Sequence, residues 1–166
     1  MTVTEKDLVS LQRQLERIPR GVVGIAARCR CGEPTVVETA PRLEDGTPFP
    51  TLFYLTHPQA VLEISRLEGS HIMVEMTDRI ASDEELAAQY RAAHEDYLAR
   101  RKKHGEVEEI DGISAGGMPT RVKCLHALLG HSLAVGPGIN PIGDEALALI
   151  DWKPETCTCG AENTDS

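Results

Sequence analysis

A chain of 166 residues can form one domain with a substantial core, but it is too short for two large domains. Its formal charge of −9 argues against general binding to nucleic acids or to anionic membranes, because such partners are attracted by a net basic surface. The sequence shows neither the pattern of a secretory leader nor an apolar run of membrane-spanning length, which predicts a cytoplasmic protein.

The first third of the chain predicts one helix and a small antiparallel sheet. Thr4 is a typical capping residue, and leucines recur at helical spacing from there to about Gln14. Three short β-like runs follow, and the first two are separated by a turn that holds Cys29 and Cys31, so they predict a hairpin. The three expected strands are residues 21–28, 35–39 and 51–56.

The middle of the chain predicts three helices. The first begins at His57, which is followed by a proline, and stops near Gly69, and Ser70 is expected to cap the second. Ser82 and Glu85 have the spacing of a capping box, which predicts the start of the longest helix. Acidic residues follow that start and basic residues end the helix, in agreement with the helix dipole.

The last third of the chain predicts a core helix and a shorter helix. After an acidic linker, Pro119 is expected to begin a helix that runs to about Val135 and places leucines on one face. Asn140 and Pro141 have the cap-then-proline order of another helix start.

These elements combine into a single domain of the α+β class. A small antiparallel sheet, made of the hairpin and the third strand, is expected to be packed by several helices. The domain is predicted to span residues 1–153, and residues 154–166 are predicted to form a polar tail that is flexible unless a metal tethers it.

The loop before the expected Pro119 helix has features of an anion-binding site. Small residues let the backbone approach a ligand, amides at a helix start point outward, and the helix dipole favours negative charge there. Two cations follow, and two arginines at the ends of other elements could clamp the same ligand. The residues concerned are Ser114, Gly116 and Gly117 in the loop, Arg121 and Lys123 after it, and Arg42 and Arg66 elsewhere. Alternatively, the glycines only form a tight turn and the cations are solvated, since the stretch lacks the ending of a phosphate-binding loop.

The pattern Cys-X-Cys-Gly occurs twice, and it predicts a zinc site. The four residues are Cys29, Cys31, Cys157 and Cys159. Four thiolates from two turns would satisfy tetrahedral Zn²⁺ and would tie the C-terminal tail to the first hairpin. Alternatively, the cysteines are free or partly buried thiols, because zinc-binding turns usually separate their cysteines by two or more residues.

Cys124 has two histidines nearby in the sequence, which suggests a nucleophilic thiol. On a helix that begins at Pro119, however, His126 would lie about 160° around the axis from Cys124, so the two could not pair. His131 would share the face of Cys124, but its backbone would lie about 10 Å away. The expectation is therefore a buried cysteine in a core helix.

Several longer stretches of the sequence resemble one bacterial family. They are residues 28–29, 39–51, 54–56, 65–68, 114–126 and 140–144. Over about residues 5–150 the chain resembles the domain-of-unknown-function family number five hundred and one, which occurs mainly in high-GC Gram-positive bacteria. Its genes often lie near those for a septum-formation initiator protein and an exopolyphosphatase. The resemblance implies a cytoplasmic bacterial protein, and it supplies no activity, cofactor or catalytic residue.

Three functional hypotheses follow. The first is the binding, with or without turnover, of a phosphorylated or carboxylated small molecule at the loop before Pro119. The second is a non-enzymatic interaction or regulatory protein with a protein partner, linked to cell division by the gene neighbourhood. The third, compatible with either, is a structural zinc protein held together by the two Cys-X-Cys-Gly turns.

Overall fold

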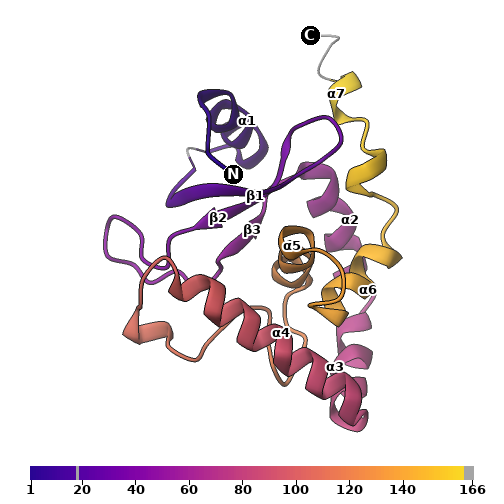
Figure 1. Ribbon diagram of the computed structural model, residues 1–166. Coiled ribbons are helices and arrows are strands. Elements are labelled where there is room, and N and C mark those ends of the chain that lie inside the picture. The colour runs from indigo at the N-terminus through magenta and orange to yellow at the C-terminus, as the bar shows by residue number, and fades with distance from the viewer. Residues whose placement is uncertain (18, 163–166) are drawn as a thin grey trace.

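Three antiparallel strands form the sheet, in the spatial order β1–β2–β3. They are β1 (Val22–Arg28), β2 (Pro34–Thr39) and β3 (Phe53–Leu55). This computed structural model describes residues 1–17 and 19–162 (Figure 1). The hairpin and the third strand are confirmed, and Val37 of the central strand pairs with Ile25 on one side and with Tyr54 on the other.

Helices cover both faces of this sheet, so the α+β class is confirmed. They are α1 (Glu5–Leu15), α2 (Pro58–Gly69), α3 (Ile72–Ser82), α4 (Glu84–Lys102), α5 (Leu125–Val135), α6 (Pro141–Leu149) and α7 (Cys159–Glu162), with short 3-10 turns at Glu108–Ile110 and Pro154–Thr156. Among the described residues, no helix combines the length and the apolar character that crossing a bilayer requires.

The helix α1 packs on one face of the hairpin. Its start is a capping box, in which the Thr4 hydroxyl accepts from the Asp7 N–H at 3.1 Å and the Asp7 carboxylate accepts from the Thr4 N–H at 3.0 Å. Leu11 is fully buried there against Ile25 and Val37. The predicted Thr4 cap is therefore confirmed, and α1 closes a small core of its own.

The helix α5 lies at the centre of the main core, between the sheet and the other helices (Figure 1). Two glycines allow this close packing. A Cβ atom at Gly130 would lie 2.8 Å from the carbonyl oxygen of Phe53, so α5 can approach β3 only without a side chain there. A Cβ atom at Gly143 of α6 would overlap the carbonyl oxygen of Leu128.

The helix α4 crosses beside the sheet and contributes fully buried aromatic residues to the same core. Tyr90 and Tyr97 are both 0% exposed. The hydroxyl of Tyr97 accepts hydrogen bonds from the backbone N–H groups of Leu52 at 2.7 Å and Phe53 at 3.2 Å. Tyr97 thus joins α4 to β3 directly.

Two predicted helix caps are wrong by a short distance. Ser70 follows the end of α2, and its hydroxyl donates to a carbonyl oxygen three residues earlier at 2.6 Å. Ser82 is the last residue of α3, and Asp83 caps α4 by accepting from the N–H of Glu85 at 3.1 Å. A serine hydroxyl can bond backward to a carbonyl or forward to an amide, so the residue type alone does not fix which helix end it occupies.

The main difference from the sequence prediction is the start of the central helix, which is Leu125 and not Pro119. Gly116 and Gly117 adopt φ values of 66° and 94°, and they fold the preceding loop back on itself. The carbonyl oxygen of Gly116 accepts from the N–H groups of Lys123 at 2.7 Å and Cys124 at 3.3 Å. The backbone from Gly116 to Cys124 therefore forms a loop and not the first turns of a helix.

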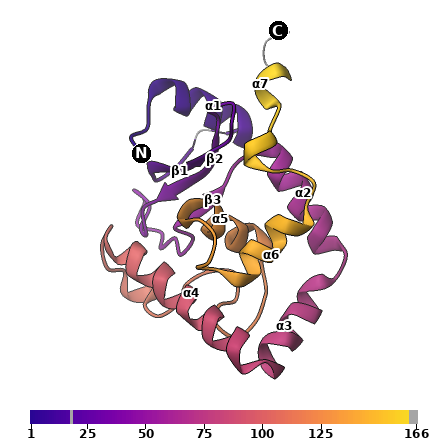
Figure 2. The ribbon, with the colours of Figure 1, turned by 45° about the vertical axis from the view of Figure 1, so that its right-hand side comes forward.

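The segment after α6 returns to the first hairpin, as Figures 1 and 2 both show. The carbonyl oxygen of Pro154 accepts from the N–H of Arg30 at 2.8 Å. The ring of Trp152 lies 5.0 Å from that of His57, and Cys157 is 2% exposed. Pro154 and Cys157 of the predicted tail thus contact the domain, and residues 163–166 lie outside the described residues.

Candidate functional site

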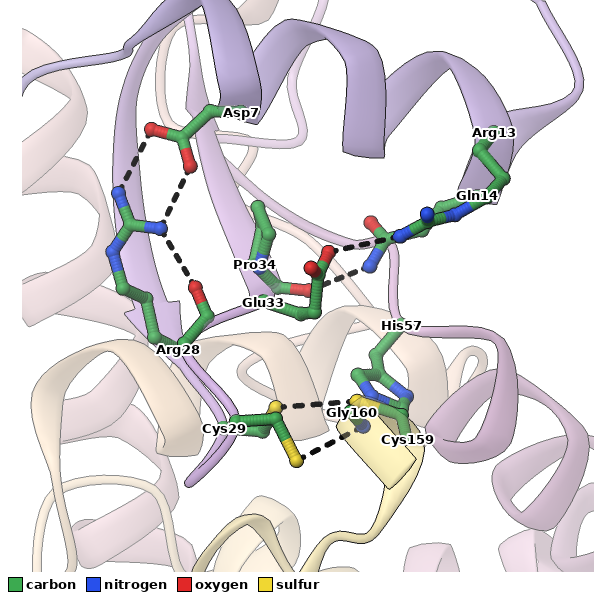
Figure 3. Close-up of polar contacts among 12 residues, drawn as sticks. Asp7, Arg13, Gln14, Arg28, Cys29, Glu33, Pro34, His57, Cys159 and Gly160 are labelled. Carbon is green, nitrogen blue, oxygen red and sulfur yellow. Dashed lines mark hydrogen bonds and ion pairs between the residues drawn. The ribbon is translucent and has the colours of Figure 1, made fainter. Parts of the chain in front are cut away.

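The two Cys-X-Cys-Gly turns meet in space. The sulfur atoms of Cys29, Cys31, Cys157 and Cys159 all lie within 4.8 Å of one another. Cys29 and Cys31 belong to the turn between β1 and β2, whereas Cys157 follows the 3-10 turn Pro154–Thr156 and Cys159 is the first residue of α7. Cys29 and Cys159, which are labelled in Figure 3, are 130 residues apart in the sequence, and their sulfurs are 3.6 Å apart.

This spacing fits a shared metal ion better than it fits a disulfide. Tetrahedral Zn²⁺ with Zn–S bonds of about 2.3 Å separates its sulfur ligands by about 3.8 Å. A disulfide requires about 2.0 Å, and the four cysteines are free thiols. The 3.6 Å between the Cys29 and Cys159 sulfurs is close to the separation on zinc.

A backbone amide supports one of these sulfurs. The N–H of Gly160 donates to Sγ of Cys31 at 3.1 Å. A Cβ atom at Gly160 would lie 3.1 Å from Cβ of Cys31 and 3.2 Å from its sulfur, which is tighter than ordinary contact. The glycine after the second cysteine pair therefore lets the backbone approach the Cys31 sulfur, as the ligand-supporting amides of metal sites do.

His57 forms a hydrogen bond to a second sulfur of the cluster, and its other ring contact fixes its tautomer. It is the N-cap of α2, and its Nδ1 accepts from the N–H of Gln59 at 3.3 Å. The ring proton therefore lies on Nε2, which donates to Sγ of Cys157 at 3.4 Å. Burial lowers the pKa of His57, so the ring stays neutral near pH 7. Nothing in the sequence around residues 157–159 indicates that His57 contacts Cys157.

The thiols of the cluster influence one another's ionisation. Burial raises the pKa of Cys29, although hydrogen bonds from nearby backbone groups oppose the effect. Burial and the adjacent thiols of Cys157 and Cys29 raise the pKa of Cys159 well above its ordinary value. Four thiols this close cannot all become thiolates unless a cation balances their charge.

An ion pair holds the hairpin turn against α1. The guanidinium of Arg28 donates to both carboxylate oxygens of Asp7, at 2.7 and 2.8 Å, and to the carbonyl oxygen of Gly32 at 3.0 Å (Figure 3). Arg13 pairs with Glu33 on the other side of the turn at 3.1 Å. The turn that carries Cys29 and Cys31 is thus fixed by side chains of α1.

The predicted anion-site residues of the Ser114–Lys123 stretch lie in the loop before α5. Ser114 is 1% exposed, and its hydroxyl lies 2.7 Å from Nδ1 of His94. Arg121 and Lys123 are exposed. Because α5 begins only at Leu125, the helix dipole at Pro119 that motivated the prediction does not exist.

The two arginines predicted as a second clamp each have a carboxylate partner. Arg42 pairs with Glu109 at 2.8 Å, and Arg66 pairs with Glu63 of its own helix at 3.1 Å. Neither contact involves the Ser114–Lys123 stretch. The ligand-binding roles of these arginines, of Ser114, Gly116 and Gly117, and of Arg121 and Lys123 stay predictions.

The structure brings together a second group of reactive side chains, in which Glu68 joins the Cys124 and His126 pair that the helical spacing had excluded. Cys124 is the N-cap of α5 with extended backbone angles, φ −146° and ψ 108°, so the geometry of a straight helix does not apply to it. Its sulfur, a ring nitrogen of His126 and a carboxylate oxygen of Glu68 all lie within 4.8 Å of one another. The prediction that Cys124 and His126 cannot approach is therefore wrong, because it depended on the misplaced helix start.

A family model described as "Protein of unknown function (DUF501)" matches residues 25–148. The chain belongs to the DUF501 family. The family suggested by the sequence is thus confirmed. No curated protein and no solved structure matches this DUF501 chain. Cys29, Cys31 and the Glu68, Cys124 and His126 group lie within the matched residues, whereas Cys157 and Cys159 lie beyond them.

Proposed function

We propose that this DUF501 protein binds one structural Zn²⁺ ion through Cys29, Cys31, Cys157 and Cys159. The metal would fasten the segment after α6 to the β1–β2 hairpin. One observation carries the proposal: four sulfurs from two turns far apart in the sequence lie within 4.8 Å of one another.

The donor set favours zinc in a structural role. Thiolates are soft ligands that select zinc over Mg²⁺ and Ca²⁺, which prefer oxygen. Four protein ligands fill a tetrahedral shell and leave no open position for a substrate, as in structural sites and unlike catalytic ones. The N–H donors of Gly160 and His57 would neutralise part of the charge on two of the sulfurs.

Native mass spectrometry of freshly purified protein tests this proposal. We expect a mass excess of one zinc ion that disappears after acid denaturation. The variant Cys29→Ser should lose the excess mass, whereas Cys124→Ser, which changes the cysteine outside the cluster, should keep it. Chelation of the zinc should lower the melting temperature by about 10 °C, because the metal binds only the folded chain.

Two outcomes would contradict zinc binding. One is a protein mass without metal together with a melting temperature that a strong chelator does not change. The other is a mass two hydrogens below that of the reduced chain, with a disulfide mapped to Cys29 and Cys159.

Anion binding stays a second candidate, and one observation supports it. Arg121 and Lys123 are exposed, and neither forms an ion pair within the part of the chain that the structure describes. A thermal-shift screen with phosphate, nucleotides and polyphosphate tests it. Stabilisation that Arg121→Ala removes would support the site, and an unchanged shift would exclude Arg121 from that role. Contact with a protein partner stays a prediction.

A further inference from the structure

None of the four cysteines of the cluster lines a cavity of about 740 Å³ on this domain. It is bounded by the end of α1, by β3, by α2 and by the start of α5. Its walls are mainly apolar and include Leu15, Leu55, Val61 and Leu62. Leu62 is 52% exposed, so part of the apolar wall is accessible from outside. Such a space suits an apolar ligand.

Reactive side chains line the same cavity where α5 begins. Cys124, His126 and Ser65 all contribute to its wall. The Nδ1 atom of His126 lies 3.1 Å from Oε1 of Glu68, and its Nε2 atom lies 3.1 Å from the hydroxyl of Ser65. Both ring nitrogens are therefore held in place.

Glu68 is itself fixed by the helix that it faces. Its Oε2 atom accepts from the backbone N–H of Leu125 at 2.8 Å. One carboxylate oxygen thus caps α5 while the other orients His126. Cys124, His126 and Glu68 are thus arranged like the nucleophile, the base and the acidic residue that orients the base in enzymes that use covalent catalysis.

The electrostatics agree with this geometry. Burial opposes ionisation of Cys124, but the nearby His126 side chain and the Ala127 backbone outweigh it and lower the pKa of the thiol. The contact with Cys124 raises the pKa of His126 against its burial, and the charge of Glu68 raises it further. The other ionisable side chains that line the cavity are Arg17, after α1, and Tyr54, on β3. A thiol at a helix N-terminus beside a cationic imidazole is the usual setting of a reactive cysteine.

We propose that Cys124 and His126 hydrolyse an ester or thioester whose acyl group is apolar, with Glu68 as the positioning residue. The acyl chain would occupy the apolar cavity. Cys124 lies outside the zinc cluster, so this proposal is independent of zinc binding.

The chemistry balances without any further reagent. The Cys124 thiolate attacks the carbonyl carbon, a C–S bond forms, and the carbonyl electron pair moves to oxygen. When that pair returns, the bond to the leaving alkoxide or thiolate breaks, and the leaving group takes the proton of His126. Neutral His126 then removes a proton from water, which attacks the acyl-enzyme and releases the carboxylic acid and the Cys124 thiolate. The net reaction is hydrolysis.

The test uses the complete protein with p-nitrophenyl butyrate as the probe. We expect a rapid release of about one equivalent of nitrophenol, then a slower continuing release as the acyl-enzyme is hydrolysed, and a butyryl group on Cys124 located by peptide mass spectrometry. Cys124→Ser, which is nearly isosteric, should abolish the adduct, and His126→Gln should slow its formation about 100-fold or more. His104→Gln, which changes a histidine near Glu38 and away from the cavity, should react like the wild type.

The role of Glu68 needs a readout that loss of structure would not mimic. In Glu68→Gln, the titration of the His126 ring, followed by NMR, should move to lower pH, and Glu68→Asp should restore part of the shift. Melting temperatures show whether each variant is folded. A butyryl group on another cysteine, or wild-type acylation in Cys124→Ser, would overturn the proposal. So would a metal ion that native mass spectrometry shows bound to Cys124 and His126.

Discussion

The side chain of Asn140 joins α5 to α6 through His131. Its Nδ2 lies 3.2 Å from Nδ1 of His131, and its Oδ1 accepts from the N–H of Gly143 at 3.0 Å. Because Nδ1 of His131 accepts, Nε2 carries the proton and donates to Asp96 of α4 at 2.8 Å. Asn140 and His131 are both 0% exposed, so this chain of bonds fixes three helices inside the core.

The first prediction concerns this buried cap. Asn140→Ala removes the bond to Gly143 and leaves His131 without a partner on one nitrogen, so we expect a loss of about 2–3 kcal/mol in the free energy of unfolding. Asp83→Ala, at the exposed cap of α4, removes only a cap and should cost about 1 kcal/mol. Urea denaturation of the two variants measures both values. Equal losses would mean that the bond to His131 contributes nothing.

The second prediction concerns pH. Burial lowers the pKa of His131, although Asp96 opposes the effect. Between the folded value and the unfolded value of about 6.5, the unfolded chain binds more protons, so the contribution of His131 to stability falls as the pH falls. The difference in unfolding free energy between the wild type and His131→Gln should therefore shrink by about 1 kcal/mol from about pH 7.5 to about pH 5.5. If this free-energy difference did not change with pH, the pKa of His131 would be the same in the folded and the unfolded chain.

The third prediction concerns the ion pair beneath the hairpin turn. The hydrogen bonds from Arg28 hold the pKa of Asp7 well below its ordinary value, against the effect of burial. The stabilisation is thus complete above the unfolded pKa of about 3.9 and is lost as the pH falls below it. Asp7→Asn should cost about 2 kcal/mol at pH 7, and the cost should diminish in acid.

An exposed ion pair offers the control for Asp7. Asp45 pairs with Arg20 at 2.7 Å, and about half of each side chain is exposed, at 51% and 54%. Asp45→Asn should therefore leave the urea midpoint almost unchanged. If Asp45→Asn and Asp7→Asn shifted the midpoint equally, burial of Asp7 would not matter to the strength of its pair.

The fourth prediction concerns the crossing of α5 and α6. Alanine is the better helix former, so Gly143→Ala would stabilise an isolated helix by about 1 kcal/mol. Here its Cβ atom would overlap Leu128 and crowd Ser132, so we expect a net loss of about 1–3 kcal/mol or more. Gly69→Ala, where a Cβ atom meets nothing within 4 Å, should be neutral or stabilising. Thermal unfolding that ranked the two variants in the reverse order would contradict this packing.

Local signals explain which parts of the fold could be predicted. The Thr4 cap, the hairpin around residues 29–33 and the start of α6 at Asn140 each depend on a few neighbouring residues, and each is confirmed. The start of α5 depends on Gly116, whose carbonyl oxygen bonds to residues seven and eight positions later. No rule of helix starts includes such a loop, so Pro119 was a misleading signal.

The candidate sites, too, could be predicted only as far as neighbouring residues in the sequence determine them. The repeated pattern identified Cys29, Cys31, Cys157 and Cys159 as a group, but their convergence depends on how the chain after α6 returns to the hairpin. The sequence could not indicate the contact of His57 with Cys157, because the two residues are 100 positions apart. The sequence also led to the exclusion of a Cys124 and His126 pair, since their approach exists only when α5 begins at Leu125.

The bonds that Tyr97 makes to Leu52 and Phe53 affect how this protein can associate with other copies of itself. A strand at the rim of a sheet normally offers free N–H groups to which a strand from another molecule can add. At the start of β3, the N–H of Phe53 and that of Leu52, which precedes the strand, already donate to a hydroxyl from within the same chain. A strand from another molecule therefore cannot pair with these two donors without first displacing the hydroxyl of Tyr97.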